Sequence, residues 1–111
     1  MKEDLGNRRC VPCEGGVAPL DTEDQKRFLK QLDCEWRVVD DGRKIQYRFL
    51  FDSFIEAMVF VNDVAAIAEA EGHHPDIHVY YRQVIIDLTT HAIEGLSDND
   101  FVLARKIELI R

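Results

Sequence analysis

The sequence predicts an α+β domain with the element order α-ββα-ββα, a four-stranded antiparallel sheet with three helices packed on one face. Two strand pairs and the helices around them point to this class. Apolar residues alternate with polar ones on both sides of Asp41-Gly42, a dipeptide typical of hairpin turns. A second pair of strand-like segments flanks Arg82-Gln83, and apolar residues at helical spacing precede, separate and follow the two pairs.

The first half of the chain supplies one helix and one hairpin. Thr22 and Gln25 have the spacing of a capping box, which predicts a helix over 22–32. Strands are expected over 35–40 and 44–51, where apolar and polar residues alternate over most of the length.

A longer helix opens the second half. Ser53 and Glu56 form another capping box, and Gly72 suits the left-handed C-terminal cap, so the helix should end near Glu71. The spacing predicts a core-facing stripe made of Phe54, Ala57, Met58, Val61, Val64, Ala65 and Ala68.

Two more strands and a last helix complete the domain. The strands are expected over 77–81 and 84–90. Ser97 begins the final helix, whose inward residues should be Leu103, Ile107 and Ile110.

Length and composition narrow the class of protein. A chain of 111 residues supports one core, here a single domain over 21–111 behind an irregular lead-in over 1–20. The net charge of -7 argues against nucleic acid or an acidic membrane as partner. No apolar run is long enough to span a membrane or serve as a secretory signal, and only three cysteines are present. These features favour a reduced, cytoplasmic setting.

All four histidines of the chain fall between Glu69 and Asp100. Imidazole gains and loses a proton near neutral pH, so this concentration indicates proton transfer or a metal site. Pro75 follows His73-His74 directly and favours an extended backbone, in which neighbouring side chains point to opposite sides. His73 and His74 should therefore have different roles.

A hairpin centred on Arg82-Gln83 would bring a further histidine to this pair. In that register Val79 pairs with Ile86, so apolar residues meet across the strands. Continued outward, the same register sets His74 opposite His91. Glu69, one helical turn before His73, could orient an imidazole or accept a donor from a ligand.

Other interpretations compete with a proton-transfer site. Three histidines can bind Zn²⁺, but diverging neighbours and the lack of a His-x-x-x-His pair on a helix make metal the weaker interpretation. Cys10 and Cys13 have the spacing of half a zinc knuckle or a redox pair. The second cysteine pair of such a knuckle is missing, so a turn with two free thiols is preferred.

Tyr81 and Asp100 each have both a structural and a functional explanation. Tyr81 can extend the apolar face of its strand while its hydroxyl reaches the site. Ser97 and Asp100 have the spacing of a capping box, which by itself explains Asp100. His78 lies within a strand and is expected to have only a surface or interface role.

The combined spacing resembles the pterin-4a-carbinolamine dehydratase family. The matching positions are Phe60-Val61, Glu69, His73-His74-Pro75, Tyr81, Thr89-Thr90-His91, Gly95-Leu96-Ser97 and Asp100. The resemblance covers the chain from about residue 20 onward, and its lead-in looks like that of bacterial members. It implies the same fold, a homo-oligomer (dimer or tetramer) built through sheet edges and helices, and neither metal nor cofactor.

The resemblance also implies an activity, the dehydration of a 4a-hydroxytetrahydropterin to quinonoid dihydropterin. This hydro-lyase step serves tetrahydrobiopterin recycling and would couple the protein to an aromatic amino acid hydroxylase. His73 is assigned as the principal acid/base, His91 as its partner, and His74 as a residue that orients the ring. The expected pterin contacts are Glu69, His73, His74, Pro75, Tyr81, Thr89, Thr90, His91 and Ala92, with Asp100 as an additional candidate.

Two positions depart from the animal members, and other functions stay open. Animal members have tryptophan where this chain has Ile77, and glutamate where it has Ala92, so Ala92 can contact the substrate only through its backbone. The alternative function is a pterin-binding protein that serves molybdopterin metabolism or a partner protein without this turnover. A pure interaction module would not need all three site histidines.

Overall fold

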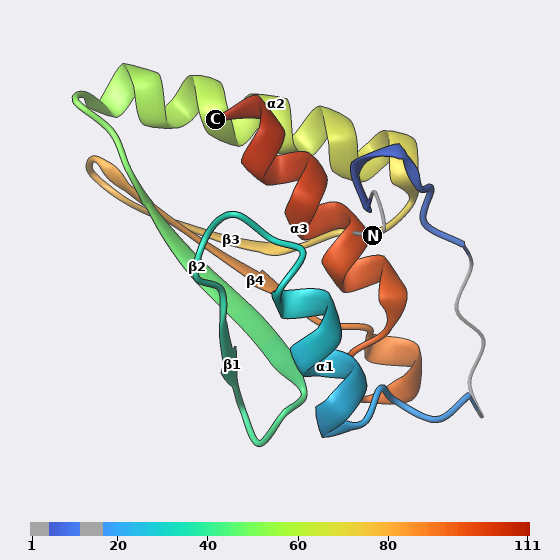
Figure 1. Cartoon of the computed structure of the whole chain (residues 1–111). Helices are drawn as coiled ribbons and strands as arrows, with labels where there is room; N and C mark the ends of the chain where they lie inside the picture. The colour runs from blue at the N-terminus through green and yellow to red at the C-terminus, as the bar shows by residue number, and fades with distance from the viewer. Residues whose placement is uncertain (1–4, 12–16) are drawn as a thin grey trace.

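The computed structural model describes residues 5–11 and 17–111 of the chain. Its elements are the short 3-10 helix η1 (Leu5–Asn7), α1 (Thr22–Leu29), β1 (Arg37–Val39), β2 (Lys44–Leu50), α2 (Phe54–Glu71), β3 (Asp76–Tyr80), β4 (Gln83–Leu88), the 3-10 helix η2 (His91–Ile93) and α3 (Asp98–Ile110). The four strands form one antiparallel sheet in the order β1-β2-β4-β3 (Figure 1). The predicted α+β class and element order are confirmed.

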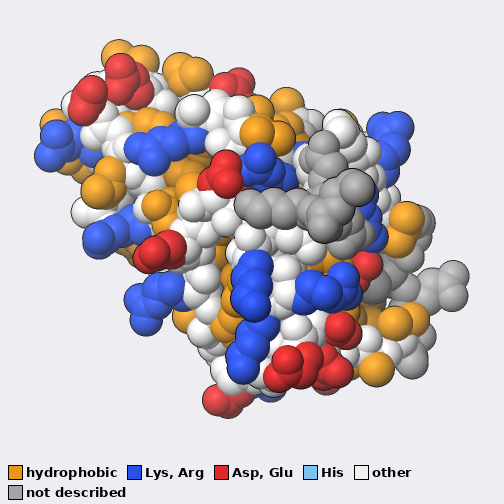
Figure 2. All heavy atoms as spheres, viewed as in Figure 1, with side chains coloured by type: hydrophobic (Ala, Val, Ile, Leu, Met, Phe, Trp, Pro, Cys, Tyr) orange, Lys and Arg blue, Asp and Glu red, His pale blue; other side chains and the backbone are white. Residues whose placement is uncertain are grey.

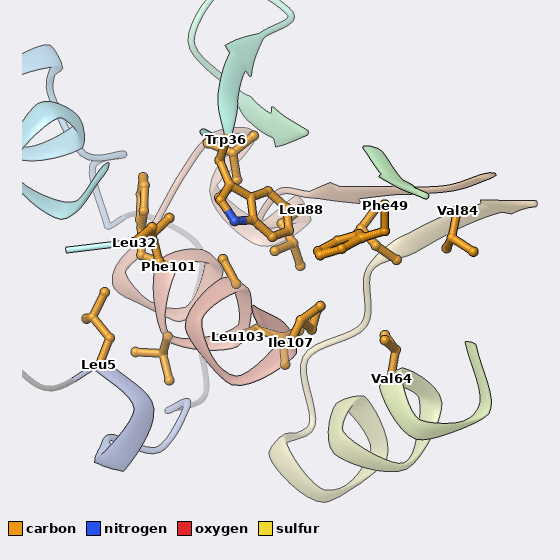
Figure 3. Close-up of a cluster of buried hydrophobic side chains, with 14 of the residues drawn as sticks. Leu5, Leu32, Trp36, Phe49, Val64, Val84, Leu88, Phe101, Leu103 and Ile107 are labelled. Atoms are coloured by element: carbon orange, nitrogen blue, oxygen red, sulfur yellow. The ribbon is translucent and has the colours of Figure 1, made fainter. Parts of the chain in front are cut away.

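The core lies between the sheet and the helices. Apolar side chains of β2 and β4 meet those of α2 and α3, and Figure 3 shows them converging from these elements. Phe28 of α1 stacks on Phe101 of α3 with ring centroids 5.2 Å apart, and Phe60 of α2 lies 4.8 Å from Phe49 of β2. The first contact joins α1 to α3 and the second joins α2 to the sheet, and the first turn of α3 contributes to the site described below.

No helix among residues 5–11 and 17–111 is long and apolar enough to cross a membrane. In the space-filling view, acidic and basic side chains are interspersed over the visible face (Figure 2).

The described part of the lead-in is fastened to the domain. Leu5 is buried in the core, and η1 lies against α3 (Figure 1). Arg8 forms a 3.0 Å ion pair with Asp98 at the start of α3. Cys13 lies outside the described residues.

The predicted register of the second hairpin is wrong by two residues. Val79 pairs with Val84 and Ile77 with Ile86, so the two-residue turn is Tyr81-Arg82 rather than Arg82-Gln83. A shift of two keeps every side chain on its face of the sheet, and apolar residues still meet apolar partners. The alternating pattern therefore could not distinguish the two registers, and His74 does not pair with His91.

The first helix also differs from its prediction. Asp21, not Thr22, is its N-cap, and its carboxylate accepts a 2.8 Å hydrogen bond from the Asp24 N–H. The helix ends at Leu29, earlier than expected.

The inward face of α2 is shifted from the predicted stripe. Phe60 is buried, while Phe54 and Ala65 are exposed. Its ends agree with the prediction, because the Ser53 hydroxyl accepts from the Glu56 N–H and Gly72 adopts the left-handed conformation at φ 68°.

Candidate active site

The end of α2 sets the direction of the adjacent histidines. The Gly72 N–H closes the last turn on the Ala68 carbonyl at 2.9 Å, and the left-handed Gly72 then turns the chain toward β3. His73 and His74 follow in the linker to β3. Their side chains take opposite environments, half-buried for His73 and exposed for His74.

His73 faces a buried carboxylate. Its Nε2 lies 2.6 Å from Oδ1 of Asp100, and the two side chains are 12% and 0% exposed. An ionised carboxylate only accepts hydrogen bonds, so the Nε2–H of the imidazole donates and Nδ1 carries the free lone pair of a neutral ring. The pair thus fixes the tautomer and orientation of His73, with Nδ1 as the nitrogen that takes up a proton.

Asp100 has a second set of partners that belongs to the fold. Its Oδ2 accepts a 3.0 Å hydrogen bond from the Ser97 N–H and a 2.8 Å hydrogen bond from the Thr90 hydroxyl. The first bond is the capping interaction that the sequence predicted at the start of α3. One buried carboxylate therefore caps α3 and holds His73, and three donors satisfy its charge.

His74 has its own carboxylate in a different setting. Its Nε2 lies 2.7 Å from Oε1 of Glu69, with side chains 60% and 78% exposed. The pair lies in solvent, so it is weak and screened by salt.

The segment after β4 carries the third site histidine. Thr90 pairs with Gly95 in an isolated bridge, which closes a loop around η2 and its first residue His91. A Cβ at Gly95 would lie 2.7 Å from the Cβ of Pro19, so only glycine allows this loop to approach the lead-in. His91 is exposed at the surface of this loop.

These segments enclose a pocket of about 350 Å³. Its volume is within the usual range for small-molecule sites. Six of the predicted contacts line it, namely His73, His74, Thr89, Thr90, His91 and Ala92. The three candidate site histidines thus line the same pocket, although they come from two separate segments of the chain.

Four further residues line the pocket that sequence reasoning did not identify: Val11, Glu71, Gly72 and Asn99. Asn99 holds the lead-in by a reciprocal pair of hydrogen bonds, accepting from the Val11 N–H at 2.9 Å and donating to its carbonyl at 2.6 Å. The Glu71 carboxylate accepts from the Cys10 N–H at 2.8 Å. The position of Glu71 beside Gly72-His73 was an available signal, whereas nothing local in the sequence links Val11 to α3.

Three predicted contacts lie outside this pocket. Glu69 reaches it only through His74. Pro75, which follows the two histidines, is half-buried and does not line the pocket. Tyr81 is 69% exposed in the β3–β4 turn, at the opposite end of a five-residue strand about 16 Å long. The predicted register placed Tyr81 at the end of the strand beside the turn, and the structure places it in the turn itself.

Neither His78 nor the described cysteines add to the pocket. His78 Nε2 lies 3.1 Å from Oδ2 of Asp87, a carboxylate that also accepts from Gln46 on the neighbouring strand. Burial, with the nearby Glu71 charge, raises the pKa of the Cys10 thiol to about 12. Among the described residues, no group of three or more His, Cys, Asp or Glu side chains is arranged to hold a metal ion.

Comparisons with known proteins agree with the fold and with the family that the sequence resembles. Two curated relatives, from Nitrosomonas eutropha and Halorhodospira halophila, are 46% and 47% identical, each over 96% of this chain and over 93% and 96% of their own lengths. Both carry the name "Putative pterin-4-alpha-carbinolamine dehydratase".

Two solved structures share the fold. A transcriptional coactivator/pterin dehydratase from Brucella melitensis superposes with a TM-score of 0.78 at 33% identity, over 83% of this chain and 97% of its own. A pterin dehydratase-like protein identified as a RuBisCO assembly factor of the alpha-carboxysome superposes with a TM-score of 0.60 at 25% identity, over 68% and 87%. The family model described as pterin 4 alpha carbinolamine dehydratase matches residues 18–110, and the chain therefore belongs to that family.

Proposed function

We propose that this protein dehydrates a 4a-hydroxytetrahydropterin to quinonoid dihydropterin and water. The observation that carries the proposal is the His73–Asp100 pair at the wall of a pocket that His74 and His91 also line. A buried carboxylate that fixes the tautomer of an imidazole beside a ligand-sized pocket is suited to general acid/base catalysis.

The reaction needs two proton transfers and no redox step. The C4a–O bond breaks, and a general acid gives a proton to the departing hydroxide, which leaves as water. The N5–H bond gives its proton to a general base, and the electron pair of that bond forms the N5=C4a double bond. One proton is delivered and one is removed, so the balance closes without a cofactor.

His73 is the principal acid/base in this proposal, with His91 as its partner. The bond from Nε2 to Asp100 leaves Nδ1 of His73 to exchange a proton with the ligand. His91 belongs to a different segment that lines the same pocket, so it can carry out the other of the two proton transfers on the same ligand. His74 would bind and orient the ring, assisted by Glu69.

The rest of the pocket is suited to a flat heterocycle with many hydrogen-bonding groups. Thr89, Thr90 and the backbone around Ala92 offer fixed donors and acceptors on one side. Glu71 and Asn99 add a carboxylate and an amide on the other, and Val11 adds an apolar contact. A few such groups around a compact cavity give a ligand its orientation.

Tetrahydropterin recycling behind an aromatic amino acid hydroxylase is the biological setting that we propose. The active form would be a cytoplasmic homo-oligomer. The alternative is pterin binding without turnover, in molybdopterin metabolism or in support of a partner protein. The structural likeness to a RuBisCO assembly factor favours keeping this second candidate.

A direct assay tests the proposal. The purified protein is mixed with a 4a-hydroxytetrahydropterin generated in situ, and formation of the quinonoid product is followed by its absorbance. Replacing His73→Gln should lower kcat by about 100- to 10,000-fold, the usual contribution of a general acid/base. His78→Gln is the matched control, because His78 also pairs with a carboxylate but lies outside the pocket. Absence of turnover by the parent protein would rule out the dehydratase and leave pterin binding as the alternative.

A further inference from the structure

A third segment of the chain reaches the candidate active site, besides the two that carry its histidines. Leu5, at one end of the described lead-in, is 1% exposed and packs in the core. Val11, at the other end, lines the pocket. Between them Arg8 forms a 3.0 Å ion pair with Asp98, the first residue of α3. Residues 5–11 therefore connect the core to the pocket.

Two buried side chains fasten the last part of this segment. The Asn99 amide, which is 4% exposed, accepts from the Val11 N–H at 2.9 Å and donates to the Val11 carbonyl at 2.6 Å. The Glu71 carboxylate accepts from the Cys10 N–H at 2.8 Å, and the Lys106 ammonium lies 3.9 Å from it. If the lead-in moved away, the buried amide would lose both of these hydrogen bonds, which is costly. The contacts therefore hold the backbone of Cys10 and Val11 in one place beside the pocket.

Val11 supplies an apolar surface that the rest of the pocket lacks. Among the ten described residues that line it, only Val11 and Ala92 have apolar side chains. Val11 has the larger side chain, and it is 65% exposed although its backbone N–H and carbonyl are both fixed. A flat heterocycle has polar edges and two less polar faces, and covering a face favours an apolar partner. The exposed Val11 side chain is therefore placed to lie against a bound ring.

The exposure of Val11 distinguishes this contact from simple anchoring. Gln25 of α1 is a comparable buried amide, 9% exposed, which donates 3.1 Å hydrogen bonds to the carbonyls of Leu20 and Gly42. It ties the segment before α1 to the β1–β2 turn and lines no part of the pocket. Asn99 instead fixes the backbone of a residue whose side chain stays open to the pocket.

On the basis of the proposed function, we infer that the lead-in is a wall of the active site. Val11 contacts one face of the bound pterin ring, and Asn99 is a positioning residue that acts through Val11. Val11 lies outside residues 18–110, the part of the chain that the family model matches. Its side chain exchanges no proton, so this wall sets the affinity for the ring and leaves the proton transfers to the histidines.

The first test removes the side chain and keeps the backbone. Calorimetric titration with 6-methyl-7,8-dihydropterin, which has the bicyclic ring but no 4a-hydroxyl group to lose, measures the Kd of the full-length protein without turnover. Val11→Ala should raise this Kd about fourfold, the value of roughly one buried CH2 group. Val59→Ala is the matched control, because Val59 is 54% exposed in α2 and lies outside the pocket. An unchanged Kd in Val11→Ala would overturn the inference.

The second test asks whether Asn99 acts through Val11. Asn99→Ala should raise the Kd about four- to tenfold, because the whole Val11 contact is lost. In the double variant Val11→Ala/Asn99→Ala the Kd should match that of Asn99→Ala, since a contact that is already lost cannot be removed twice. Gln25→Ala is the matched control for loss of a buried amide, and its Kd should equal that of the parent even where its melting temperature falls. Additive effects of the two single changes would show that Asn99 acts independently of Val11 and would overturn its positioning role.

Turnover separates this inference from the activity on which it rests. In the dehydration assay, Val11→Ala and Asn99→Ala should raise KM in proportion to Kd and leave kcat within about twofold of the parent. A fall in kcat at unchanged KM would overturn the inference, because the lead-in would then serve the chemistry. Absence of turnover by the parent, with the Kd changes as expected, would rule out the dehydratase and keep the wall. Failure of the parent to bind the dihydropterin would overturn both.

Discussion

The adjacent residues His73 and His74 each pair with a carboxylate at nearly the same distance, but the two pairs differ in how far they are exposed to solvent. His73 and Asp100 are 2.6 Å apart with side chains 12% and 0% exposed, whereas His74 and Glu69 are 2.7 Å apart with side chains 60% and 78% exposed. In water such a pair contributes little, because solvent screens it and each long side chain loses freedom. In the interior the same contact is expensive to break.

The difference teaches that separation alone does not identify a working acid/base. The buried pair is part of a network that reaches Thr90 and the first turn of α3, so His73 has one tautomer and one orientation. The exposed pair has no such support. Loss of a carboxylate should therefore matter in the first pair and hardly at all in the second.

Among changes to the groups that support the two histidines, the largest effect is expected from Asp100→Asn. The amide removes the buried charge and offers a donor where His73 needs an acceptor, so the imidazole loses its fixed tautomer. We expect kcat to fall by about 10- to 100-fold or more, as for other residues that orient a functional imidazole. Thermal unfolding measures the capping role separately, and loss of a hydrogen-bonded charge should cost about 1.5–3 kcal/mol.

A result for Asp100→Asn in which stability falls but turnover of the folded enzyme is unchanged would return Asp100 to a purely structural role. The pH profile of kcat distinguishes the two cases. A structural residue leaves the profile in place, whereas a residue bonded directly to the acid/base His73 changes it.

A smaller effect is expected from Thr90→Val, which keeps the size of a buried side chain but removes its hydroxyl. Oδ2 of Asp100 then retains the Ser97 N–H and loses the 2.8 Å donor. Turnover should fall by up to about tenfold, or about 1.4 kcal/mol at the transition state. Thr90→Ser restores the hydroxyl and should recover most of the rate. Equal rates in the valine and serine variants would show that the network does not reach His73.

A still smaller effect is expected from Glu69→Gln. Its partner His74 is exposed, and such pairs are worth about 0–1 kcal/mol. We expect KM to rise less than about threefold, with kcat unchanged, and the difference should vanish as salt is raised because exposed charges are screened. A drop in kcat as large as that of Asp100→Asn would erase the contrast between the two pairs.

The local features of this site could be predicted from the sequence, whereas its long-range contacts could not. Gly72 as a left-handed cap, Ser97–Asp100 as a capping pair and the diverging His73 and His74 all follow from spacings of a few residues, and the structure contains each of them. The bond from Asp100 to His73 joins two segments that only the packed core brings together, and capping alone had already explained Asp100.

The alternation of apolar and polar residues in β3 and β4 also leaves their pairing register undetermined. A shift of two residues preserves both faces of a strand, so the pattern gave the faces of β3 and β4 but not their register. That error placed His91 opposite His74. The structure instead brings His91 to the pocket through the loop that Thr90 and Gly95 close. Val11 lies at the same pocket although nothing in the local pattern of the lead-in predicts a contact with Asn99.

The smallest effect is expected from Cys10→Ser. This substitution tests whether the lead-in supports the pocket of the buried pair through the Cys10 thiol or only through its backbone. The Cys10 Sγ lies 3.6 Å from the Asn99 carbonyl, while the contact to Glu71 comes from the backbone N–H, which serine retains. Burial and the Glu71 charge raise the thiol pKa from 9.0 to about 12, so the thiol stays protonated at and below pH 9 and adds no inflection to the activity. We therefore expect kcat/KM within about twofold of the parent between pH 6 and 9, since the change exchanges a weak S–H donor for an O–H donor at the same position.

Cys34→Ser is the matched control. Burial also raises the pKa of the Cys34 thiol, to about 11, and Cys34 lies beside Glu108 rather than in the pocket. A tenfold loss in Cys10→Ser alone would mean that this side chain, and not only the backbone of the lead-in, positions the wall of the His73 pocket.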